Sequence, residues 1–129
     1  TETKKLQLIE ARRGQGLFKR RVRQKEKKCR VTGVSSIKHL TASHIKPWRL
    51  SSPSEKLDGN NGLLLSPHVD HLFDRGYISF GANGALLLSP RMKNDILNAW
   101  SIDPNLNVGD FLPEQERYLK FHREKIFKK

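Results

Sequence analysis

The sequence contains little cysteine, no long apolar run and no apolar leader. Its one cysteine, Cys29, excludes an internal disulfide framework and agrees with a reducing compartment. No stretch approaches the roughly 18 consecutive apolar residues of a membrane span, and the opening residues TETKKLQLIE lack the apolar core of a signal peptide. Neither membrane insertion nor export is expected, and cytoplasmic localisation is predicted.

Length limits the number of domains. The 129 residues, of which 36% are hydrophobic, are enough for one compact domain with a modest core and too few for two ordinary domains. We therefore predict a single domain over residues 1–129. Because the chain opens on Thr1 rather than on Met, we expect a processed chain or one domain of a longer protein.

Acidic residues are scarce relative to basic ones, and the excess is uneven along the chain. Lys and Arg number 25 against 13 Asp and Glu, and the resulting charge of +12 favours association with polyanions such as nucleic acid. The basic residues are concentrated in the N-terminal segment, residues 1–30. Within it, Leu17, Phe18 and Val22 recur at helical spacing. This pattern predicts a helix that docks one face and offers a cationic face to phosphate, with a solvated or disordered arm as the alternative.

Apolar periodicity and turn residues predict a mixed α+β class. The expected elements are loosely helical residues 1–10, a break at 13–16, a helix at 17–28, two short strands within 29–45, a long loop at 46–62, a buried strand at 63–66, a helix at 67–76, a hairpin at 77–89, and helices at 91–100 and 113–127. Trp48 is expected to pack in the core beside Pro47, and Trp100 to pack with the C-terminal helices.

A histidine stands where the predicted strand before the long loop ends. His44 lies in the sequence ASHIKPW, where a strand end fixes the direction of its imidazole. A half-buried structural histidine is one interpretation. The other is a base, since an imidazole near its ordinary pKa can take a proton from water at neutral pH.

The helix at 67–76 carries side chains that can bind a metal ion. Ser66 and Pro67 are typical of a helix start, and Asp70 and Asp74 are spaced i, i+4, so that both can face one ion. His68 and His71 can also share a face. Oxygen-rich ligation of this kind suits one Mg²⁺ or Mn²⁺ ion. A base and a cation of this type are the parts needed for one-metal hydrolysis of a phosphodiester.

Three blocks, CRVTG, ASHIKPW and NNGLLLSPHVDHLFDRGYISF, follow one another in the chain. Together they resemble the HNH endonuclease superfamily, and most closely the branch with the pattern SHIxPW followed by NGLLLSPHxDxLFDxG, found in modification-dependent restriction endonucleases. The resemblance covers a core of about residues 14–90 and leaves a helical extension at about 91–129. It implies a ββα-metal core with a basic N-terminal helix, an extra β-hairpin and C-terminal helices.

The resemblance also implies roles for individual residues. His44 matches the general base that activates water, and Asn61 matches the middle letter of the HNH name and would orient His44 or its loop. An alignment with colicin-type DNases puts Asp70 and Asp74 at metal ligands, whereas the branch motif makes His68 the final histidine. We take His68 and Asp70 as the first candidates for metal binding, with Asp74 next, and a single Mg²⁺ or Mn²⁺ ion as the cofactor.

Two departures from the superfamily pattern stand out. Ser43 occupies the position before the base where many members have an Asp or His ligand, so weak metal binding is expected. Many members also hold a structural zinc ion with paired CxxC motifs. The corresponding positions here are Cys29, Thr32, Ser66 and Val69, and a structural zinc is not expected.

The resemblance therefore predicts a metal-dependent DNA endonuclease that serves as the cleavage domain of a restriction enzyme, with dependence on modified DNA left open. The expected partner is double-stranded DNA, with a fused DNA-reading domain outside this chain and a homodimer left open. The candidate DNA-contacting residues are Lys19, Arg20, Arg23, Lys46 and Arg49. The alternatives are a non-catalytic DNA-binding domain on the same scaffold and a toxin-type nuclease with an immunity partner.

Overall fold

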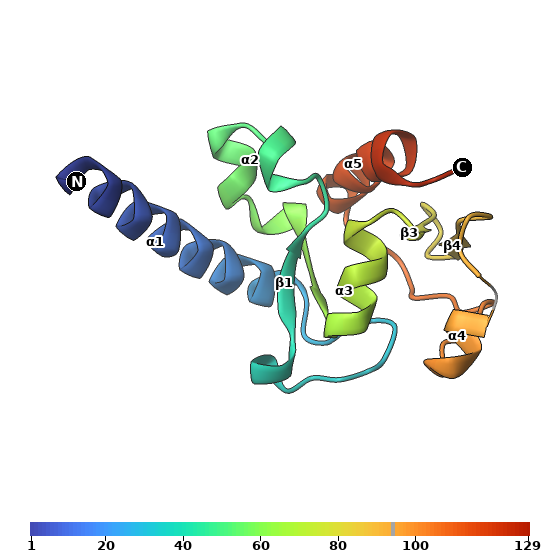
Figure 1. The fold of residues 1–129 in the computed structure, drawn as a ribbon. Helices are drawn as coiled ribbons and strands as arrows, with labels where there is room; N and C mark the ends of the chain where they lie inside the picture. Colours follow the sequence, from blue (N-terminus) through green and yellow to red (C-terminus); the bar gives the residue numbers. More distant parts are fainter. Residues whose placement is uncertain (94) are drawn as a thin grey trace.

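The structure is a computed structural model that describes residues 1–93 and 95–129. It has the predicted α+β class (Figure 1). Helices and strands follow the order α1 (Glu2–Lys25), β1 (Thr41–His44), α2 (Pro53–Leu57), β2 (Gly62–Leu65), α3 (Pro67–Asp74), β3 (Ile78–Phe80), β4 (Leu86–Leu88), α4 (Asp95–Ala99) and α5 (Pro113–Phe121). The 3₁₀ turns are η1 (Ile37–His39), η2 (Trp48–Leu50) and η3 (Gly59–Asn61), and a π-helical turn, η4 (His122–Ile126), continues α5.

The predicted ββα core is confirmed. Strands β1 and β2 pair antiparallel, with Thr41 opposite Leu65 and His44 opposite Gly62. Every residue of β2 is buried, as expected for a short apolar run, and α3 follows it directly and packs against β1. The pairing therefore brings the His44 end of β1 to the start of β2.

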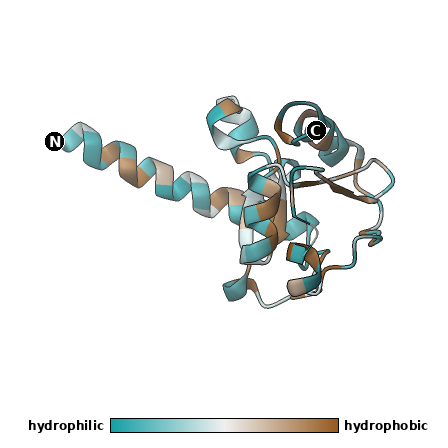
Figure 2. Ribbon diagram, turned by 45° about the vertical axis from the view of Figure 1, so that its right-hand side comes forward, coloured by the Kyte–Doolittle hydropathy of each residue, from teal (hydrophilic) through white to brown (hydrophobic). Residues whose placement is uncertain are grey.

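The N-terminal residues form one continuous helix, so the predicted loose start and the break at 13–16 are wrong. Thr1 caps α1 by accepting the Lys4 backbone N–H at 3.2 Å. Glycines within a helix cost only about 1 kcal/mol each, which tertiary contacts of the helix can offset. Here Phe18 and Val22 are buried and hold the C-terminal half of α1 on the body, whereas the N-terminal half extends away from it and exposes both hydrophilic and hydrophobic residues (Figure 2).

Residues 29–45 contain one strand rather than the two predicted. Residues 29–36 instead turn back on themselves, because the Cys29 N–H donates to the Val34 carbonyl at 2.9 Å and the Gly33 N–H donates to the Cys29 carbonyl at 2.8 Å. Gly33 adopts a φ of 81°, which favours glycine. The Thr32 and Ser66 hydroxyls share a hydrogen bond of 2.7 Å, which ties this turn to the start of α3.

The segment predicted as a long loop, residues 46–62, contains the helix α2. Ser52 accepts the Glu55 backbone N–H and the Glu55 carboxylate accepts the Ser52 N–H, which forms a capping box with Pro53 in the first turn. The sequence SPSE carried this signal. Proline and glycine on either side of α2 favoured the incorrect prediction of an uninterrupted loop.

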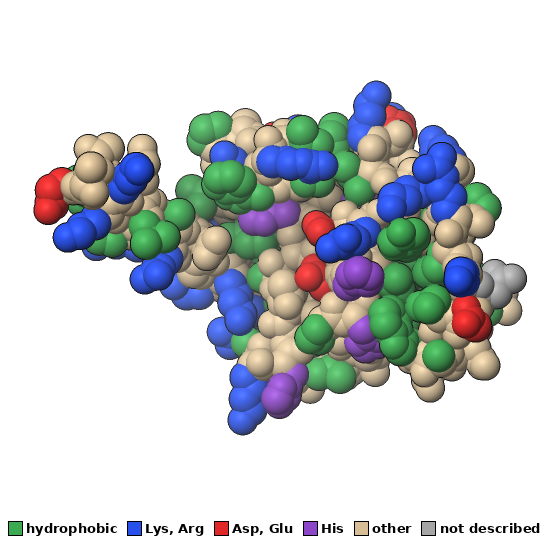
Figure 3. All heavy atoms as spheres, in the orientation of Figure 1, with side chains coloured by type: hydrophobic (Ala, Val, Ile, Leu, Met, Phe, Trp, Pro, Cys, Tyr) green, Lys and Arg blue, Asp and Glu red, His purple; other side chains and the backbone are tan. Residues whose placement is uncertain are grey.

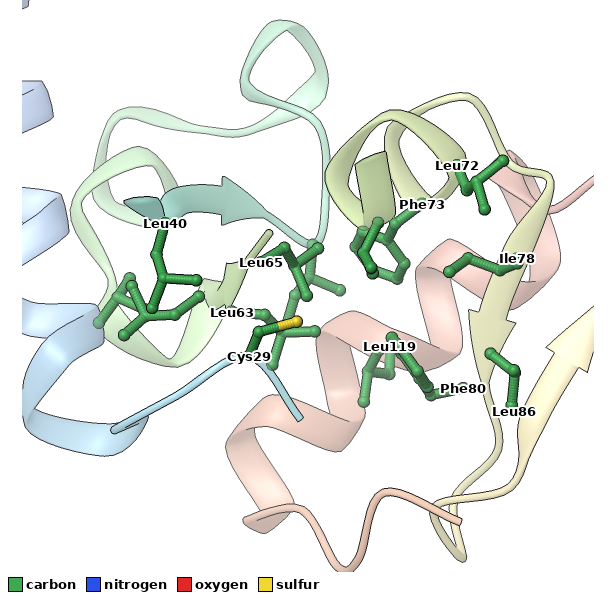
Figure 4. Close-up of a cluster of buried hydrophobic side chains, with 14 of the residues drawn as sticks. Cys29, Leu40, Leu63, Leu65, Leu72, Phe73, Ile78, Phe80, Leu86 and Leu119 are labelled. Atoms are coloured by element: carbon green, nitrogen blue, oxygen red, sulfur yellow. The ribbon is translucent and has the colours of Figure 1, made fainter. Parts of the chain in front are cut away.

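The hydrophobic core lies between β2, α3, the β3–β4 hairpin and α5, and Cys29 points into it (Figure 4). His122 is buried there, stacked on Phe73, with Nε2 bound to the Phe73 carbonyl at 2.8 Å and Nδ1 to the Ser79 hydroxyl at 2.7 Å. Burial lowers the pKa of His122 to about 4, so its imidazole is a neutral structural group at physiological pH.

Both tryptophans were predicted to pack in the core, and both predictions are wrong. Trp48 is 54% exposed and Trp100 is 40% exposed. The predicted hairpin and the predicted helix start at Pro113 are confirmed. Of the helix predicted over 91–100, residue 94 lies outside the described residues and α4 is observed from Asp95.

In the part of the chain that the structure describes, no helix combines the length and the hydropathy needed to cross a membrane.

Candidate functional site

A cleft of about 440 Å³ opens between the end of β1, the turn that follows it and one face of α3. Acidic and histidine side chains gather at the middle of this side of the molecule, with lysine and arginine side chains around them (Figure 3). The residues that line the cleft are Thr41, Ala42, Ser43, His44, Pro47, Trp48, Arg49, Asp70 and Asp74.

His44 is held in one orientation by two contacts. Its ring stacks on Phe18 of α1, with centroids 3.6 Å apart and planes 5° from parallel. Its Nε2 lies 2.8 Å from the Lys56 carbonyl oxygen. Because a carbonyl only accepts, Nε2 carries the proton in the neutral ring and Nδ1 keeps its lone pair.

The surroundings of His44 favour the neutral, basic form of the ring. Burial lowers its pKa below the ordinary value, the hydrogen bond to the Lys56 carbonyl partly offsets this, and the nearby Lys56 charge lowers it further. Nδ1 makes no hydrogen bond with the described residues. The imidazole can therefore accept a proton at Nδ1 at neutral pH.

Asn61 is fully buried and braces the chain on either side of α2 rather than touching His44. Its Oδ1 accepts the Lys46 backbone N–H at 2.8 Å, and its Nδ2 donates to the Glu55 carbonyl at 3.0 Å and to the Ser51 hydroxyl at 3.3 Å. Glu55 precedes Lys56, whose carbonyl binds the imidazole. Asn61 thus braces the loop that carries the Lys56 carbonyl, and its role in orienting His44 or its loop stays a prediction.

Asp70 and Asp74 bring carboxylates to the same cleft from consecutive turns of α3. Asp70 is half-buried, and Ser43 lines the same cleft. Burial raises the pKa of Asp70, the neighbouring Ser43 side chain lowers it, and the Asp74 charge raises it again. A divalent cation between the two carboxylates would relieve this repulsion.

The two histidines of α3 face a different direction. His68 meets the Trp100 ring edge-on with centroids 5.4 Å apart, and His71 meets the same ring at 6.5 Å. Neither histidine lines the cleft. Of the three predicted metal-binding residues, the structure therefore places Asp70 and Asp74 beside His44 and places His68 against Trp100.

The donor set fits a hard divalent cation only in part. Within residues 1–93 and 95–129 there is no group of three or more His, Cys, Asp and Glu side chains arranged to hold a metal ion. Two carboxylates are nevertheless enough for Mg²⁺, which keeps several waters and takes further oxygens from a phosphate substrate. Asp70 and Asp74 are the residues that could hold such an ion.

The five residues predicted to contact DNA do not lie on one surface. Arg49 lines the cleft, and Arg20 and Arg23 line a separate groove of about 410 Å³ beside α1. Lys19 lies half-buried on α1. Lys46 instead forms an ion pair with Glu55, with Nζ 2.9 Å from Oε1, so this cation is engaged within the protein.

Sequence reasoning missed the two groups that orient the imidazole. The apolar spacing that contains Phe18 predicted a docking face for α1 but did not identify the ring it meets. No sequence pattern distinguishes the Lys56 carbonyl from any other backbone group. Both contacts depend on how α1 and α2 pack around the end of β1.

Gly62, opposite His44 in the strand pair, allows α1 to approach the site. A Cβ atom there would overlap Val22 Cγ2 and lie 2.7 Å from Phe18 Cζ. We expect Gly62→Ala to lower the free energy of unfolding by roughly 1–3 kcal/mol, because α1 must shift and carries the ring that supports His44. Urea titration followed by circular dichroism measures the change.

Gly14→Ala is the matched control for this substitution. A Cβ at Gly14 meets Leu57 Cδ2 at an ordinary 3.5 Å within the continuous helix α1. The same glycine-to-alanine change should stabilise the protein there by about 0.5–1 kcal/mol. Equal effects of the two substitutions would contradict the close approach at Gly62.

A comparison with protein families matches one segment of the sequence. Residues 29–81, which include β1, β2, α3 and β3, match the family model described as HNH endonuclease. The resemblance to the HNH superfamily is confirmed over this segment, and the match supports a nuclease of the HNH type. The comparison with curated proteins gives no match.

Proposed function

We propose, from the premise that residues 29–81 form an HNH endonuclease core, that this protein hydrolyses phosphodiester bonds in double-stranded DNA in a metal-dependent reaction. One observation carries the proposal. The fixed imidazole of His44, with its Nδ1 lone pair available, lines the same cleft as the carboxylates of Asp70 and Asp74. A base and a pair of hard oxygen donors on one cleft are what hydrolysis of a phosphodiester requires.

In this reaction His44 acts as the general base. Nδ1 accepts a proton from the attacking water, the water oxygen bonds to phosphorus, and the bond from phosphorus to the 3′ oxygen breaks. The Lys56 carbonyl holds the Nε2 proton and accommodates the positive charge that the ring acquires. A divalent ion bound by Asp70 and Asp74 would supply stabilisation of the negative charge on the phosphate.

Contacts to the DNA backbone are proposed for the exposed cations near the site. Arg49 lies on the cleft itself, and Arg20 and Arg23 extend the cationic surface along α1. Contacts to phosphate position the DNA without reading its sequence, so these residues alone should give a weakly selective nickase. The resemblance supports a restriction role, in which a separate DNA-reading domain would supply selectivity for sequence or base modification.

Plasmid nicking tests the proposed function. Incubation of the protein with supercoiled plasmid and Mg²⁺ or Mn²⁺ should produce open-circular DNA, with EDTA abolishing the product, because the cation is needed at the phosphate. Gel electrophoresis over a time course separates the nicked form from the supercoiled form. Absence of nicking with both metals, in a preparation that binds the plasmid, would contradict the enzymatic proposal.

The donor set also favours a second candidate, a non-catalytic DNA-binding domain on the same scaffold. Ser43 stands where a stronger ligand is usual, and no three-donor cluster is found among the described residues. This candidate expects DNA binding that neither depends on divalent metal nor leads to nicking. Binding and nicking measured on one preparation distinguish the two candidates.

A further inference from the structure

The turn that follows β1 exposes large apolar side chains at the rim of the cleft. Trp48 is 54% exposed and Leu50 is 47% exposed, with Arg49 between them in η2. An indole normally buries most of its large surface. When a ligand covers an indole that is exposed to water, the free energy of the system falls. Trp48 therefore has surface available for a partner beside His44.

The turn that carries Trp48 is closed by backbone and side-chain hydrogen bonds. Its backbone closes through hydrogen bonds from the Leu50 N–H to the Pro47 carbonyl at 2.9 Å and from the Ser51 N–H to the Trp48 carbonyl at 3.1 Å. The buried Ser51 hydroxyl donates to the Pro47 carbonyl at 3.0 Å and accepts from Asn61. A ring on so well braced a turn loses little entropy on binding.

Trp48 borders two hollows and has a cation over one face of its ring. It lines the cleft that contains Asp70, and it also lines a second hollow of about 570 Å³ that runs beside α1 and includes His44 and Pro53. The Lys56 ammonium lies 3.8 Å from the centroid of the indole ring. Since the Lys56 carbonyl also binds Nε2 of His44, one residue connects the exposed ring to the imidazole.

We propose that Trp48 stacks on a nucleobase that opens out of the bound duplex, next to the phosphate attacked by the water that His44 activates. This inference rests on the proposed function, because it takes DNA as the partner. The Lys56 ammonium lies over one face of the indole, so a base would stack on the opposite face, and Arg49 of the same turn would meet the charged backbone. Stacking of this kind tolerates all four bases, so Trp48 would add affinity and position the strand without selecting a sequence.

Fluorescence of single-tryptophan variants tests the contact, since the chain has only two tryptophans. His44→Ala combined with Trp100→Phe leaves Trp48 as the reporter, and His44→Ala combined with Trp48→Phe leaves Trp100. With a duplex oligonucleotide in EDTA, we expect Trp48 emission to be quenched on binding and Trp100 emission to change little. Trp100 is a matched control because it is also exposed and lies against His68, away from the cleft.

Affinity gives a second readout. Trp48→Ala should weaken binding of a labelled duplex roughly 5- to 100-fold in fluorescence anisotropy, and Trp48→Phe should recover part of the loss. Trp100→Ala should change affinity less than about twofold. Thermal unfolding of each variant shows whether the fold is kept.

Two results would overturn the inference. The first is that the duplex binds without changing Trp48 emission and that Trp48→Ala binds it as tightly as the protein with Trp48. The second is that the duplex does not bind at all. These outcomes are distinguishable from failure of the proposed function, because nicking is measured separately on protein with both tryptophans. Nicking without quenching of Trp48 contradicts only the stacking contact.

Discussion

Replacing His44 by alanine is expected to reduce the rate of plasmid nicking by about 100-fold to 10,000-fold. A positioned general base contributes a factor of this size, and no other described histidine lines the cleft. Initial rates of open-circle formation, measured at one metal concentration for both proteins, give the ratio. The substitution should leave DNA affinity nearly unchanged, because the imidazole is assigned to proton transfer rather than to binding.

His39→Ala is the matched control. This histidine is exposed on η1 and lies outside the cleft, so its removal should leave the nicking rate within about twofold. Because the pKa of His44 lies below its ordinary value of about 6.5, the neutral base should persist below that pH, and the rate should fall only on further acidification. A His44→Ala rate close to that of His39→Ala would remove His44 from the mechanism.

The sequence predicted the elements that form the ββα core because their signals are local. The apolar run of β2 and the Ser66–Pro67 start of α3 each specify an element within a few residues, and both were found, with β2 one residue earlier than predicted. The break near Gly14 was wrong since helix propensity is a weak preference and the packing of Phe18 and Val22 offsets it.

Side-chain burial was predicted less well, because burial depends on the whole fold. Trp48 has a large aromatic side chain of the kind usually buried in a core. The closed turn of η2 nevertheless directs it to the surface. Trp100 follows α4 and meets the histidines of α3 with only part of its ring covered. Neither outcome can be read from apolar spacing.

The candidate site was predictable in its residue types and not in its contacts. The i, i+4 spacing of Asp70 and Asp74 placed both on one face of α3, and the structure turns that face to His44. His68 lies two residues before Asp70, about 200° around the helix, which is why it cannot share that face. The rotation of α3 about its own axis is set by the burial of Val69, Leu72 and Phe73.

The same geometry predicts that the carboxylates of α3 act through a cation. Asp74→Asn should lower the nicking rate by at least about 100-fold, because metal ions stabilise the charge at phosphorus by several kcal/mol. It should also abolish the rise in thermal midpoint that Mn²⁺ produces in the unsubstituted protein, since a ligand that binds only the folded state stabilises it. Differential scanning fluorimetry with and without Mn²⁺ measures this second effect independently of activity.

Without metal, the sign of the stability change caused by Asp74→Asn distinguishes a metal-binding role of this carboxylate from a structural role. In EDTA the two carboxylates of the cleft repel each other, so Asp74→Asn should leave stability unchanged or slightly higher, whereas loss of a structural contact would lower it. Asp110→Asn, an exposed aspartate outside the cleft, should retain both nicking and the Mn²⁺ shift. If Asp74→Asn keeps the Mn²⁺ shift, the cation binds elsewhere, and the carboxylates of α3 must be assigned another role.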